Sequence, residues 1–91
     1  MRFWDASAIV PLLLDEAGRD RLLAELERDP DMFVWWGSAV ECVSAISRRE
    51  REGALSLADA HASLERLRAL SEAWQEVLPS DVVRITAQRL L

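Results

Sequence analysis

The chain alternates between short apolar runs and longer stretches of helical periodicity. One apolar run at residues 1–4 stops at Asp5, and another at residues 32–36 stops at Gly37. Short apolar runs that end at polar or turn residues are typical of buried strands. The pattern therefore predicts strands at these two places, and residues 76–79 have the character of a brief third strand.

Helical segments connect the first two strands. Ser7 is a candidate N-cap for a short helix over residues 8–14, and Pro11 marks that helix as short or irregular. Leucines then recur at helical spacing over residues 22–26, and the helix they predict ends at the turn signal of residues 29–31.

Longer helices are predicted in the second half of the chain. The first begins at Ser38 and ends near Gly53, and Ser80 is a candidate cap for a last helix through Leu91. The expected core positions of the two middle helices are Ala39, Cys42, Val43 and Ile46 in the first, and Leu57, Ala60, Leu64, Leu67 and Trp74 in the second.

The order strand, helix, strand favours parallel pairing through right-handed crossovers. Strands that are apolar along nearly their whole length are typical of a parallel sheet that is covered on both faces. We therefore expect an α/β domain with three short parallel strands and helices on both faces. A mostly helical structural protein without a sheet is the alternative that this pattern leaves open.

Length and composition restrict the class of protein further. The 91 residues hold one domain, residues 1–91, which excludes a multi-domain enzyme. Eleven basic and sixteen acidic side chains give a net charge of −5, which argues against unselective coating of nucleic acids or membranes. A single cysteine, no leader pattern and no apolar stretch near the roughly 20 residues that span a bilayer predict a soluble, cytoplasmic protein.

Two acidic residues are candidates for a shared site. Asp5 lies at the carboxyl end of the first predicted strand, and Glu41 lies in the first helical turn after the second. Parallel neighbours bring both to the rim where open α/β sheets bind ligands. Facing carboxylates repel unless a proton or a cation lies between them, and Mg²⁺ or Mn²⁺ suits such oxygen ligands. Metal-assisted hydrolysis of a phosphodiester is the matching chemistry.

Each of these acids also has a purely structural interpretation. Residues 38–41 have the form of a capping box, in which Ser38 and Glu41 each satisfy a backbone N–H at the start of the helix. Asp5 can equally serve as a turn or cap residue after its strand.

Several other side chains are weaker candidates for function. Arg48 follows Glu41 by seven residues and shares its face, so it is a candidate RNA contact, although a charged run near a helix end is typical of a solvated face. Cys42 is expected in the core and His61 at its edge or on the surface. The four tryptophans are expected to be buried rather than to stack on bases, and they are Trp4, Trp35, Trp36 and Trp74.

The combination of these segments resembles the PIN-domain ribonucleases, especially the VapC-type toxins of toxin–antitoxin pairs. The resemblance spans the whole chain, and an Asp at the end of a strand, with a Ser two positions later and a Glu in this context, is its most specific part. The segments that carry it are residues 3–10, the Asp15–Glu16 turn, residues 38–42, Arg48–Arg49 and residues 53–55.

The resemblance implies a metal-dependent endoribonuclease of a type II toxin–antitoxin system. Asp5 and Glu41 are then ligands of Mg²⁺ or Mn²⁺ and catalytic residues, and Ser7 is a polar residue that lines the site. The resemblance also implies a homodimer, a cognate antitoxin that inserts into the site, and a structured RNA such as tRNA as the substrate.

The sequence departs from this family after Leu91, where family members continue into a segment that carries the remaining acidic ligands. Asp59 and Asp81 lie in the wrong context to replace them. The expectation is therefore a partial PIN-like domain with weak or absent activity. The alternative is a non-catalytic PIN remnant that binds the antitoxin or its own copy through helices rich in Leu and Ala. Separately, the apolar edge around Phe3 is expected to be open to another chain.

Overall fold

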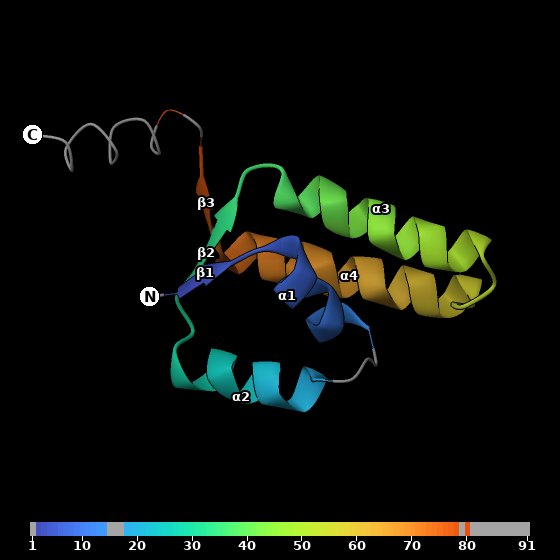
Figure 1. Ribbon diagram of the computed structural model, residues 1–91, viewed down its shortest axis with the longest axis horizontal. Coiled ribbons are helices and arrows are strands. Elements are labelled where there is room, and N and C mark those ends of the chain that lie inside the picture. Colours follow the sequence, from blue (N-terminus) through green and yellow to red (C-terminus); the bar gives the residue numbers. More distant parts are fainter. Residues whose placement is uncertain (1, 15–17, 79, 81–91) are drawn as a thin grey trace, which may run out of the picture.

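The computed structural model describes residues 2–14, 18–78 and 80, and shows a small α/β domain (Figure 1). Within these residues the chain alternates strands and helices as the hydrophobic pattern predicts. The last predicted helix, which follows its candidate cap Ser80 over residues 81–91, lies outside the described residues. The elements are β1 (Arg2–Trp4), α1 (Ala6–Leu13), α2 (Arg19–Arg28), β2 (Met32–Trp35), α3 (Ser38–Arg51), α4 (Leu57–Ala73) and β3 (Gln75–Val77).

The strands form a parallel sheet in the order β1-β2-β3. Phe3 pairs with Phe33 and Trp4 with Val34, and on the other side of β2 Trp35 pairs with Val77. The prediction of a three-stranded parallel sheet is confirmed, and the alternative of a helical protein without a sheet is wrong.

The helices pack against one face of this sheet. Trp4, Met32 and Val34 point into a single core cluster to which α1, α2, α3 and α4 all contribute. On the opposite face the Phe3 and Trp35 side chains are 53% and 38% exposed and their rings are 5.7 Å apart. The described residues therefore do not meet the prediction of helices on both faces. In the strand order 1-2-3, successive right-handed crossovers advance in the same direction and place their helices on the same side.

Most of the predicted core positions of α3 and α4 are confirmed. Cys42, Ile46, Ala60, Leu67 and Trp74 are buried. Two positions were wrong. Val43 is 41% exposed because Ser38, Cys42 and Ile46, at intervals of four residues, form the inward stripe of α3, and Leu57 is 76% exposed at the first position of α4.

Two arginines from other helices bind the C-terminal end of α1. The last carbonyls of a helix have no partner within it and carry the negative end of its dipole. Arg19 Nε of α2 donates to the Leu12 carbonyl at 3.4 Å, and Arg66 Nη1 of α4 donates to the Leu13 carbonyl at 2.8 Å. The first contact holds α2 to the neighbouring α1, and the second holds α4 to α1 across 53 residues of sequence.

We expect Arg66→Ala to destabilise the fold by about 1–3 kcal/mol, because it leaves the carbonyl of a buried residue without its charged donor. The free energy of unfolding, measured by urea denaturation, tests this. Arg66→Lys, which keeps the charge, is expected to recover part of the loss.

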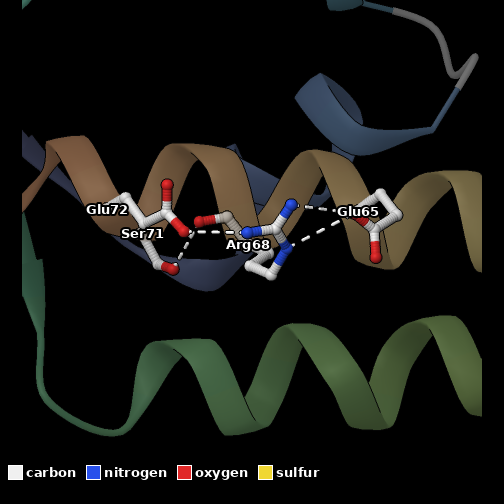
Figure 2. A network of polar contacts seen from close by, with 4 residues as sticks. All are labelled: Glu65, Arg68, Ser71 and Glu72. Carbon is white, nitrogen blue, oxygen red and sulfur yellow. Dashed lines mark hydrogen bonds and ion pairs between the residues drawn. The ribbon is translucent and has the colours of Figure 1, made fainter.

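Arg68→Ala is the matched control on the same helix. Figure 2 shows the Arg68 guanidinium between the Glu65 and Glu72 carboxylates, at 3.1 Å and 2.9 Å, and all three side chains are exposed. Because exposed ion pairs contribute little to stability, Arg68→Ala should cost less than Arg66→Ala. An equal loss of unfolding free energy in the two variants would show that the hydrogen bond from Arg66 to α1 stabilises the fold no more than an exposed ion pair does.

Candidate functional site

The two candidate acids follow the carboxyl ends of neighbouring parallel strands. Asp5 comes directly after β1, which ends at Trp4, and Glu41 lies in the first turn of α3, shortly after β2 ends at Trp35. Since β1 and β2 are hydrogen-bonded to each other in parallel, both acids lie toward the same edge of the sheet, as the sequence predicted.

The Asp5 carboxylate caps α1. Its Oδ1 accepts the Ala8 backbone N–H at 3.1 Å and the Ser7 hydroxyl at 2.6 Å, so Oδ2 takes part in neither bond. The predicted Ser7 cap is therefore wrong. The backbone of Asp5 is extended and α1 begins at Ala6, so Ser7 is already within the helix and its hydroxyl turns back to Asp5.

These bonds lower the pKa of the Asp5 carboxyl group and so favour its ionised form. The Ser7 hydroxyl has the largest effect and lowers the pKa of Asp5 from its ordinary value, with smaller contributions from backbone N–H groups and an opposing effect of burial. The same contacts thus serve the helix start and maintain a negative charge at the end of β1.

Glu41 faces a groove between α1 and α3, here called the α1–α3 groove. Its volume is about 330 Å³. Ser7, which is bonded to Asp5, lines the same groove. The structure therefore brings the Asp5–Ser7 pair and Glu41 to one surface. The full lining is Ala6, Ser7, Val10, Pro11, Glu41, Ala45, Arg48 and Arg49.

The predicted capping box at residues 38–41 is absent. The cap of α3 is Gly37, with no side-chain hydrogen bond, and Ser38 is only 3% exposed. The backbone of Gly37 is already near helical geometry, so Ser38 becomes the first residue of α3 and packs inward. The Glu41 side chain is exposed and forms no hydrogen bond or ion pair with another described residue, which leaves its carboxylate available to a ligand.

The other end of the groove is basic. Arg48 and Arg49 line it about two turns along α3 from Glu41. Arg49 Nη1 donates to the Ala45 carbonyl at 3.3 Å. Sequence reasoning singled out Arg48 and missed the apolar wall of Val10, Pro11 and Ala45. Ala45 lies four residues after Glu41 and therefore on the same face of α3, so its position in the wall could have been predicted from the sequence.

The donor chemistry of this groove suits a hard divalent cation. Glu41 offers a carboxylate and Ser7 a hydroxyl oxygen in the groove, and Asp5, which is bonded to Ser7 but does not itself line the groove, offers a second carboxylate beside it. Mg²⁺ is commonly held by one or two carboxylates together with waters and substrate phosphates. Within residues 2–14, 18–78 and 80, no group of three or more His, Cys, Asp or Glu side chains converges. Asp81, a residue considered as a further ligand, lies outside the described residues.

The other candidate residues lie where the sequence predicted, except for Trp35 and Trp36. Cys42 is fully buried, and burial raises its thiol pKa to about 11, with a smaller effect from the negative charge of Glu41. His61 is exposed on α4, as expected. Trp4 and Trp74 are buried, but the expected burial is wrong for Trp35 and Trp36, which are 38% and 56% exposed at the open face and end of β2.

Comparison with known proteins adds no family. No protein-family model matches the sequence, and no curated protein is significantly similar to it. Among the described residues, no helix is long and apolar enough to span a membrane.

We expect Ser7→Ala to raise the pKa of Asp5 toward its ordinary value of 3.8, because it removes the hydrogen bond that lowers that pKa most. A carboxyl group whose pKa is lowered by folding stabilises the fold above its unfolded pKa, and this stabilisation is lost as the pH falls through the folded pKa. The variant should therefore lose less stability than the wild type between neutral and strongly acidic pH.

A ¹³C-detected NMR titration of the Asp5 carboxyl group measures this pKa directly. Ser44→Ala, which removes an exposed hydroxyl from α3, is the matched control and should leave the pKa of Asp5 unchanged. An unchanged pKa in Ser7→Ala would mean that the Ser7–Asp5 hydrogen bond does not form in solution.

Proposed function

We propose that the chain is a metal-dependent endoribonuclease of the PIN-domain, VapC-type toxin class. The observation that carries this proposal is the α1–α3 groove, which Glu41 shares with the Ser7 that is bonded to Asp5. The parallel sheet with acids after neighbouring strands is the arrangement in which such a site is expected. The resemblance of the sequence motifs to this family supplies the substrate, RNA.

In this proposal each residue has a defined task. Asp5 and Glu41 would hold Mg²⁺ or Mn²⁺ through carboxylate oxygens, and the contact from Ser7 lowers the pKa of Asp5 and so favours its ionised form. Because the bonds from Ser7 and Ala8 to Asp5 both end on Oδ1, neither bond would occupy Oδ2, which could then contribute to holding a cation. When bound, the cation polarises the phosphoryl group and lowers the pKa of a coordinated water.

The proposed activity is weak. Since the described part of the chain offers carboxylates from Asp5 and Glu41 alone, a cation there would depend on water and on the phosphate oxygens of RNA for its other ligands. By the same resemblance, we propose a cytoplasmic setting, a homodimer and a cognate antitoxin that covers the groove.

A non-catalytic, self-associating module is the second candidate function. The exposed aromatic side chains of the sheet favour it: Phe3 and Trp35 are 53% and 38% exposed, and Phe3 lies on β1, an edge strand of the sheet in the described residues. Large exposed apolar patches and unpaired strand edges are typical of association sites.

We expect Asp5→Asn and Glu41→Gln each to weaken Mn²⁺ binding at least about 10-fold, the scale of losing a contact in a metal site. Both substitutions remove the charge and keep the shape, and Asn remains a good N-cap, so the fold should persist. The electron paramagnetic resonance signal of free Mn²⁺ measures binding, and Mg²⁺-dependent cleavage of a labelled RNA should fall in parallel.

Glu52→Gln is the control, since it removes an exposed carboxylate at the other end of α3. It should leave both Mn²⁺ binding and cleavage unchanged. Mn²⁺ binding that is unaffected by either Asp5→Asn or Glu41→Gln would contradict the nuclease proposal and favour the non-catalytic module.

If the open sheet face mediates association, the purified chain should form dimers or larger species in sedimentation velocity, and Phe3→Gln should shift them toward monomer. Val40→Gln, on the exposed face of α3, removes a side chain that is 69% exposed without touching the sheet. It should leave the distribution unchanged. A monomeric wild type at every concentration would contradict the module.

A further inference from the structure

We propose that the basic end of the α1–α3 groove, at Arg48, binds a backbone phosphate of single-stranded RNA that lies beyond the phosphodiester at Asp5 and Glu41. This inference rests on the proposed function and deepens it, because it assigns how the strand runs along the groove. It concerns binding alone and requires no cation.

Nine arginines lie in the described residues, and Arg48 is one of four that form no hydrogen bond or ion pair there, with Arg21, Arg28 and Arg51. Of these four, only Arg48 lines the α1–α3 groove, and its side chain is exposed. Other arginines are engaged: Arg2 with Glu25, Arg19 with the Leu12 carbonyl, Arg49 with the Ala45 carbonyl, Arg66 with the Leu13 carbonyl, and Arg68 with Glu65 and Glu72.

The spacing along α3 favours an extended anionic ligand. Seven residues separate Glu41 from Arg48, which is about 10 Å along a helix and nearly two full turns, so the two side chains share the groove face. A single inorganic phosphate is too small to contact both ends. An RNA strand carries phosphates along its length, and the apolar wall at Val10, Pro11 and Ala45 lies where a sugar or base between them would pack.

The interaction of Arg48 with the dipole of α3 can be separated experimentally from its proposed contact with a phosphate. Arginines in the last turn of a helix interact favourably with its dipole, and Arg48, Arg49 and Arg51 all occupy that position in α3. Arg51, however, lines a different groove, between α3 and α4, together with His61. Arg51→Ala therefore removes the same charge from the same helix end without touching the α1–α3 groove.

The test uses a fluorescein-labelled hexauridylate in EDTA, with anisotropy recorded over a series of salt concentrations. We expect Arg48→Ala to weaken binding and to reduce the slope of log K against log salt by about 0.7, the value for one lost phosphate contact on a single strand. Arg51→Ala should leave the slope unchanged, and Arg48→Lys should retain it. Without a cation, Glu41→Gln should strengthen binding, because it removes a negative charge from the path of the RNA.

Equal changes in Arg48→Ala and Arg51→Ala would overturn the proposal, because they would indicate unselective attraction to the helix end. No detectable binding by the wild type, or an unchanged slope in Arg48→Ala, would also overturn it. Hydrolysis does not occur in EDTA, so loss of this subsite and loss of the metal-dependent activity are separate results.

Discussion

The parallel pairing of β1 with β2 is the interaction on which the candidate site depends. It places Trp4 beside Val34, both buried, and so brings the residues that follow each strand to one edge of the sheet. A slip of one residue would turn Trp4 out of the core and Phe3 into it, because side chains alternate between the faces of a strand. Burial of Trp4 and Val34 therefore fixes the register, and the register fixes where Asp5 and Glu41 lie.

Asp5 shows how a structural role and a chemical role occupy one side chain. The bonds from Ser7 and Ala8 start α1 at the point where β1 ends, and they also favour the ionised carboxyl group. The interpretation of Asp5 as a cap is thus confirmed without excluding the proposed ligand role, since both bonds use Oδ1. Glu41 has no such structural role, because the predicted capping box of residues 38–41 does not form.

The sequence was sufficient for the elements and insufficient for details that depend on their packing. Period and turn signals identified β2 and α2, whose limits at Trp35 and Arg28 lie within a residue of the predicted ones. The predicted cap of α1 was wrong because Asp and Ser have similar N-cap propensities. Only the extended backbone at Asp5 shows that this residue, and not Ser7, is the cap. The predicted burial of Val43 was wrong because periodicity does not define how wide the buried stripe of a helix is. The α1–α3 groove could not be predicted because it depends on how α1 packs against α3.

The strand order links the open sheet face to the availability of the site. Because β1 is an edge strand in the described residues and carries Phe3, a neighbour that pairs with β1 would also meet the exposed rings of Phe3 and Trp35. The α1–α3 groove lies among the helices, which pack on the opposite face. Association through the sheet and binding in the groove therefore use different surfaces. A partner on the aromatic face leaves Glu41 and Arg48 accessible, so self-association and binding in the groove are physically compatible within one chain.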